Sequence, residues 1–66
     1  MMLKGYRIDI LRGEAGLTVT ELAHKAGVGI SSVQNARHGR KVSVLTAGRL
    51  AKALGIPLEH LINEEE

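Results

Sequence analysis

Apolar residues recur every three or four positions along most of this chain, which is the spacing of one face of an α-helix. The repeat is interrupted by Gly16, Gly27, Gly39 and Gly55, and again by Pro57. Glycine after an apolar-periodic segment is a typical helix end, because it readily adopts the left-handed conformation there. No segment shows the strict alternation of a half-buried strand. The pattern therefore predicts an all-α fold of about five helical segments.

Each predicted helix carries apolar positions that can face one core. The first covers about residues 4–15, the second opens at Thr18, and the third covers about 30–38. A fourth follows the N-cap Ser43, and Pro57 starts a short fifth. The expected inward-facing residues are Tyr6 or Arg7, Ile8, Leu11, Ala15, Leu22, Ala23, Ala26, Val28, Val33, Ala36, Val44, Ala47, Leu50, Ala51, Leu54, Leu58, Leu61 and Ile62.

The most specific local signal lies between Thr18 and Arg37. Thr18 and Glu21 have the spacing of a capping box, in which each side chain accepts from the other residue's backbone N–H. The helix that follows is separated from the next one by a short turn that contains Gly27. Two such helices form a helix-turn-helix unit, whose second helix can enter the major groove of DNA. The polar side of 30–38 is the candidate reading surface.

Composition narrows the class of protein. Sixty-six residues suffice for one domain with one small core, and Tyr6 is its sole aromatic residue. The chain has no cysteine, which fits a reducing compartment. Its apolar runs are far shorter than the ~20 residues that cross a membrane, and its start lacks the apolar stretch of a signal peptide. We therefore expect a single domain over residues 1–66 in the cytoplasm.

Charge is distributed unevenly. Residues 1–58 contain nine Lys and Arg but three acids, whereas four of the seven acids lie in the last eight residues, which include an acidic tail at 63–66. Five basic residues and no acid lie between Arg37 and Lys52. A basic body attracts polyanions, of which nucleic acid is the commonest. A solvated, solubilising surface would have the same composition, so charge leaves both interpretations open.

The residue pattern gives little support to catalysis or metal binding. His24, His38 and His60 lie far apart on different predicted helices, without cysteine or paired-histidine spacing for a metal. The serines lack the context of a nucleophile elbow or a triad. We therefore expect no enzyme activity, no cofactor and no metal ion.

The order and spacing of residues from Ile8 to Ile62 resemble the lambda-repressor-like helix-turn-helix family, the Cro and phage-repressor group. The resemblance implies a compact five-helix domain that binds operator DNA as a homodimer. It also implies a sequence-specific transcription regulator, most often a repressor. The matching residues are Ile8, Leu11, Arg12, Ala15 to Thr18, Glu21 to Ala23, Ala26 to Val28, Val33, Gly39, Ser43 and Leu50 to Ile62.

Three positions depart from the residues that are usual in this family. Val19 stands where the family often has Gln, and Gly29 stands where it usually has a Ser or Thr cap. Ile30 replaces a polar residue at the first solvent-facing position of the recognition helix. These departures keep an alternative open, a protein-interaction module such as the antitoxin of a toxin–antitoxin pair.

Arg37 is a fourth departure. The family often has an acid here that pairs with an Arg of the first helix, which this chain has as Arg12. Two guanidinium groups cannot form that ion pair. Either Glu14 or Asp9 takes over the partnership, or Arg37 points outward to a DNA phosphate.

The candidate DNA contacts divide by chemistry. Amide side chains can bond to adenine N6 and N7, and an apolar group can contact the thymine methyl, whereas phosphates are bound by charge and reach. The expected base contacts are Ile30, Ser31, Gln34 and Asn35. The expected phosphate contacts are Thr18, Arg37, Arg40 and Lys41. The alternatives are that the reading residues form only the solvated face of a surface helix, and that Thr18 is only a helix cap.

A homodimer would need an apolar surface. Leu45 falls off the apolar stripe of its helix and is a candidate for that surface. The other candidates are Ile56, Leu58 and Ile62, unless the core uses them. Arg49 and Lys52 are expected on the far, solvated side of the fourth helix.

Overall fold

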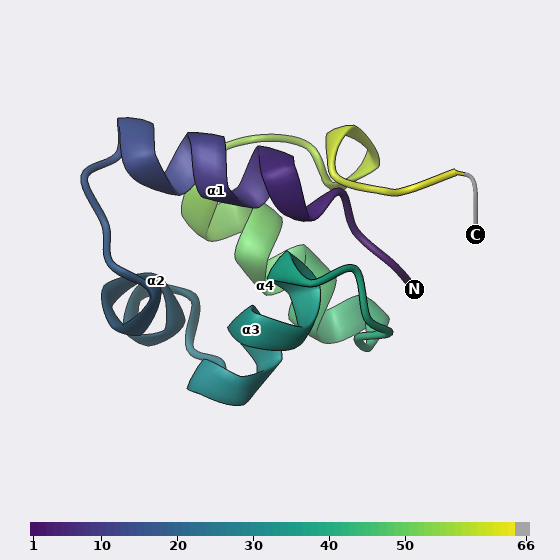
Figure 1. Ribbon diagram of the computed structural model, residues 1–66, viewed down its shortest axis with the longest axis horizontal. Coiled ribbons are helices and arrows are strands. Elements are labelled where there is room, and N and C mark those ends of the chain that lie inside the picture. Colours follow the sequence, from purple (N-terminus) through teal and green to yellow (C-terminus); the bar gives the residue numbers. More distant parts are fainter. Residues whose placement is uncertain (65–66) are drawn as a thin grey trace.

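The computed structural model describes residues 1–64 and is drawn in Figure 1. These residues form four α-helices and one 3-10 turn: α1 (Gly5–Glu14), α2 (Val19–Ala26), α3 (Ile30–Arg37), α4 (Val44–Leu54) and η1 (Leu58–His60). An isolated antiparallel bridge joins Leu3 to Ile62. The all-α prediction is confirmed over this range, in which no helix has the length and apolar character needed to cross a bilayer. Of the expected acidic tail at 63–66, Glu65 and Glu66 lie outside the described residues.

The fifth helix expected after Pro57 is not confirmed as an α-helix. Pro57 is extended, and the segment after it makes one 3-10 turn closed by the Leu61 N–H donating to the Leu58 carbonyl at 2.8 Å. The chain cannot continue as a helix, because Ile62 is already paired with Leu3.

The N-terminal segment has a structural role that apolar periodicity did not reveal. The Lys4 N–H donates to the Leu61 carbonyl at 2.7 Å, and the Val42 N–H donates to the Met1 carbonyl at 2.8 Å. Leu3 lies between these bonds and is buried. The first residues therefore join η1 to the loop between α3 and α4.

All four α-helices contribute to one core. Ile8 of α1, Val33 of α3 and Leu50 of α4 are completely buried, and so is Leu61 after η1. The buried apolar residues are Leu3, Ile8, Leu22, Ala23, Val33, Ala36, Ala47, Leu50, Ala51 and Leu61. Except for Leu3, each of these was expected from the helical spacing.

Of the two alternatives Tyr6 and Arg7, Arg7 is the half-buried one, and two other residues expected in the core are exposed. Tyr6 is 63% exposed because it lies two positions from buried Ile8, about 200° around α1. Ala15 is exposed because α1 has already ended at Glu14. Val44, the first residue of α4, is 64% exposed.

The predicted caps of α2 and α4 are confirmed. The Glu21 N–H donates to Thr18 Oγ1 at 3.1 Å, and the Thr18 N–H donates to Glu21 Oε1 at 2.9 Å, which completes the capping box. This second bond, from the backbone of Thr18, holds the pKa of Glu21 below its ordinary value. The Thr46 N–H donates to Ser43 Oγ at 3.0 Å, as expected of an N-cap. Gly27 ends α2 with φ of 71°, a conformation that a residue with a Cβ rarely adopts.

Gly5 allows α1 and α3 to approach closely. A Cβ at this position would overlap the carbonyl oxygen of Arg37 and lie 2.6 Å from its carbonyl carbon. The first turn of α1 therefore sits directly against the last residue of α3, an arrangement that is open only to glycine. This contact places α1 next to the C-terminal turn of α3, the predicted recognition helix (Figure 1).

Candidate nucleic-acid interface

α3 has one buried side and one solvent-facing side. Val33 and Ala36 are completely buried, which fixes how the helix sits against the rest of the domain. Ser31 is exposed and Ile30 is 49% exposed. The two amide residues, Gln34 and Asn35, are half-buried. The four expected base-contact residues thus remain reachable on a short helix.

The residues expected to contact phosphates differ in whether their donors are already bound within the protein. Arg40 and Lys41 are exposed in the loop between α3 and α4. Thr18 is also exposed, but its backbone N–H is already bound by Glu21 in the capping box. Among these three residues, the loop cations are the ones whose donors project into solvent with the reach to bind DNA phosphates.

Asp9 is the acid that pairs with Arg37. Arg37 Nε donates to Asp9 Oδ1 at 2.6 Å, and Arg37 Nη2 donates to Asp9 Oδ2 at 3.3 Å. Arg12 also donates to Asp9 Oδ1 from Nη2, at 2.9 Å. Sequence reasoning had named Asp9 as one of two possible partners, and the fold selects it over Glu14. Asp9 thus accepts from an Arg of its own helix and from an Arg of α3.

The geometry of this cluster shifts two pKa values. The hydrogen bonds that Arg37 donates hold the pKa of Asp9 below its ordinary value, against partial burial, which acts to raise it. The same pair raises the pKa of Arg37 above its ordinary value. Arg12 contributes further to the effect on Asp9 and, through Nη1, donates to the Leu17 carbonyl at 3.0 Å. One carboxylate thus links α1, α3 and the segment before α2.

The solvent-facing side of α3 with its four expected base-contact residues is called the reading face below. Arg37 also reaches a residue of this face. Its Nη1 donates to Gln34 Oε1 at 2.7 Å. The sequence contains the i, i+3 spacing that allows this bond, but the spacing alone does not say that Arg37 turns along α3 rather than toward solvent. In the structure, three of the guanidinium's five N–H groups already have protein acceptors.

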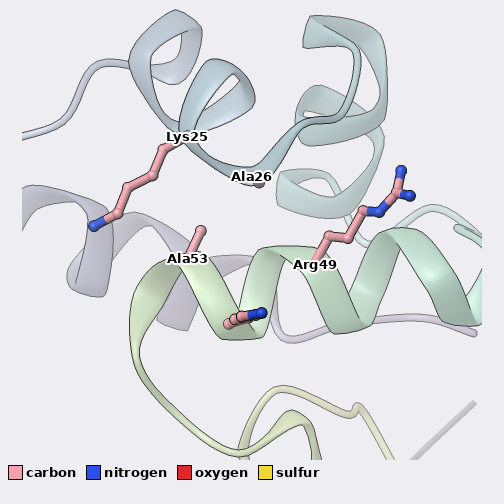
Figure 2. A pocket seen from close by; sticks show the side chains of 5 residues that line it. Lys25, Ala26, Arg49 and Ala53 are labelled. Atoms are coloured by element: carbon pink, nitrogen blue, oxygen red, sulfur yellow. The ribbon is translucent and has the colours of Figure 1, made fainter.

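A basic hollow lies between the end of α2 and the second half of α4. It measures about 420 Å³ and is lined by Lys25, Ala26, Arg49, Lys52 and Ala53. Figure 2 shows Lys25 and Arg49 projecting from different helices, with Ala26 and Ala53 between them. Arg49 and Lys52 are exposed, as expected, and α2 adds a third cation, Lys25, to the lining of the same hollow.

The candidate dimer residues are not equally exposed. Leu45 is 62% exposed beside Val44, at the start of α4. Ile56 and Leu58 are partly buried and pack against the core, and Ile62 pairs with Leu3. Most of the exposed apolar surface of this group therefore comes from the first turn of α4.

The three histidines are exposed on separate elements, α2 for His24, the end of α3 for His38 and η1 for His60. Across residues 1–64, no three His, Asp or Glu side chains are grouped so that they could hold a metal ion.

Two short helices, a left-handed glycine turn and an exposed polar face on the second helix define a helix-turn-helix DNA-binding domain. The chain belongs to the helix-turn-helix family, whose sequence pattern matches residues 8–61, and within it to the Cro and phage-repressor type. This family consists of DNA-binding regulators rather than enzymes.

Among solved structures, the chain is similar to the restriction-modification controller protein C.AhdI from Aeromonas hydrophila. The two share 36% sequence identity over 88% of this chain and 89% of that chain, with a TM-score of 0.78. No curated protein matches the sequence.

Proposed function

We propose that this protein is a transcription regulator of the restriction-modification controller type, which binds a specific double-stranded DNA site as a homodimer and acts as a repressor. The reading face of α3 carries this proposal. Ser31, Gln34 and Asn35 lie on its accessible side, while Val33 and Ala36 hold the opposite side in the core. A helix mounted in this way can enter the major groove with its polar residues toward the base edges.

The loop after α3 supplies cations beside this face. Arg40 and Lys41 follow α3 directly and are exposed, so a DNA backbone at the rim of the groove lies within their reach. Phosphate contacts of this kind give affinity and position the protein without selecting a sequence. We assign Arg40 and Lys41 the main phosphate contacts, with Arg37 and Thr18 as secondary ones because Asp9 and Glu21 already bind their donors.

The test is to select bound sequences from random duplexes and then measure the affinity for the selected site at several salt concentrations. The dissociation constant should rise with salt, and Lys41→Gln should reduce the slope of log K against log[salt] by about 0.9, the value for one phosphate contact. Lys52→Gln is the matched control, because it removes the same charge from the basic hollow, on another part of the surface. An affinity that does not change with salt, or an equal effect of both variants, would reject the proposed phosphate contacts.

Dimerisation is proposed through the start of α4, where Leu45 and Val44 are both largely exposed. A two-fold dimer would present its recognition helices about 34–36 Å apart to a site with two half-sites. Sedimentation of the wild-type protein and of Leu45→Asp tests this arrangement. The variant should be monomeric and should bind a single half-site more weakly than the wild type binds the full site. A wild-type protein that remains monomeric on the selected DNA would contradict the proposal.

The exposed Ile30 and Leu45 also favour a second candidate function, an antitoxin-like module that binds another protein. Ile30 places an apolar side chain at the start of the recognition helix, where a polar base contact is usual in the family. Purification of the protein after co-expression with the product of a neighbouring reading frame distinguishes the two candidate functions. Stable co-purification in the absence of DNA, together with no sequence enriched from random duplexes, would favour the protein-binding module.

A further inference from the structure

The side-chain amide of Gln34 is held in one orientation by a charged donor. Arg37 Nη1 lies 2.7 Å from Gln34 Oε1. A guanidinium has donors and no acceptor, so the oxygen of the amide must face it. The amide NH₂ group is attached to the other side of the same planar carbon and therefore points away from Arg37.

Arg37 keeps the Gln34 amide in this orientation because the position of Arg37 is itself fixed by a residue of another helix. Two of its nitrogens bind the two carboxylate oxygens of Asp9, 28 residues earlier in α1, at 2.6 and 3.3 Å. Such paired bonds between a guanidinium and a carboxylate fix direction as well as distance. The orientation of an amide on α3 is thus determined by a residue on α1.

On the basis of the function proposed above, we propose that Asp9 and Arg37 are positioning residues that make Gln34 select guanine over adenine. A Gln that reads adenine accepts from N6 with its oxygen and donates to N7 with its nitrogen. In this protein the amide oxygen is turned toward Arg37 and accepts from it, so Gln34 presents its NH₂ group to the DNA. Guanine offers two acceptors in the major groove, N7 and O6, whereas adenine offers N7 next to a donor.

The experiment is selection from random duplexes, with the base preference compared position by position between wild type and variants. The wild type should prefer guanine over adenine by about tenfold at one position of each half-site, and Gln34→Ala should abolish the preference there. Asp9→Asn and Arg37→Met should reduce the same preference at least threefold, leaving the other positions unchanged. A loss of stability or of phosphate contacts would instead lower the affinity for all sequences alike and leave the guanine preference unchanged.

Arg12→Met is the matched control, because it removes a partner of Asp9 but leaves the bond between Arg37 and Gln34 in place. It should retain the guanine preference. Far-ultraviolet circular dichroism identifies the variants that fold. If Asp9→Asn does not fold, the test uses Arg37→Met alone. An unchanged preference in the folded Arg37→Met variant, or an adenine at the position that Gln34 determines, overturns the assignment while leaving the proposed function intact. A wild-type protein that enriches no sequence overturns both.

Discussion

The substitution Gly5→Ala should destabilise this domain, although alanine is normally favoured over glycine in a helix. The added methyl group would overlap the carbonyl oxygen of Arg37 and lie 2.6 Å from its carbonyl carbon. Both atoms belong to backbone at the end of α3, which cannot move aside as a flexible side chain can. The first turn of α1 and the last turn of α3 would therefore have to separate.

The expected size follows from two opposing contributions. Alanine gains up to about 1 kcal/mol of helix propensity over glycine, and less at the first position of a helix such as α1. Forcing extra volume into a packed contact costs typically about 1–3 kcal/mol. We expect a net loss of roughly 1–2 kcal/mol in the free energy of unfolding, or a fall in Tm of about 5–15 °C for a domain of this size.

Gly13→Ala and Gly48→Ala are matched controls. Both glycines lie inside helices, and a Cβ at either position meets no atom of the described chain within 4 Å beyond its own helix backbone and neighbours. Each should stabilise the domain by about 0.5–1 kcal/mol. Thermal and urea unfolding followed by circular dichroism measures all three. If Gly5→Ala were as stable as Gly13→Ala, the close approach of α1 to α3 would be wrong.

Three further predictions concern the charge of Asp9, the N-cap of α2 and base recognition by α3. The folded pKa of Asp9 is lowered by Arg37, so its contribution to stability should be complete above the unfolded-state pKa of about 3.9 and disappear as the pH falls through the folded value. In urea unfolding, Asp9→Asn should thus have a free energy of unfolding about 1 kcal/mol lower than that of the wild type at pH 7, and this difference should shrink below pH ~3.9. A difference that stays constant with pH would refute the contribution of the Asp9 charge to stability. Thr18→Ala removes the cap of α2 and should cost about 1 kcal/mol, whereas an unchanged Tm would mean that the capping box is not formed in solution. Asn35→Ala should relax the base preference at one position of each half-site while keeping the salt dependence, and an unaltered selected sequence would remove Asn35 from the reading face.

Most of the secondary structure was predictable because it depends on interactions between residues close in sequence. The capping box of Thr18 and Glu21 spans three residues, and glycines such as Gly27 end helices through their own backbone conformation. The burial of Ile8, Val33 and Leu50 followed equally from helical spacing, since each helix must turn its apolar side toward a shared core. The same spacing left Tyr6 and Arg7 as alternatives, because a short helix with few apolar residues allows two registers.

What depends on contacts between distant residues was decided only by the tertiary structure. Sequence reasoning left the partner of Arg37 open between Asp9, Glu14 and a phosphate, and the packing of α1 against α3 through Gly5 brought Asp9 within reach. Burial of Leu3 likewise requires the pairing of the N-terminal segment with the residues after η1, which periodicity within one segment cannot reveal. Local sequence thus determined the helices and their core-facing sides, whereas the orientation of the polar groups beside the reading face required two helices to be placed against each other in space.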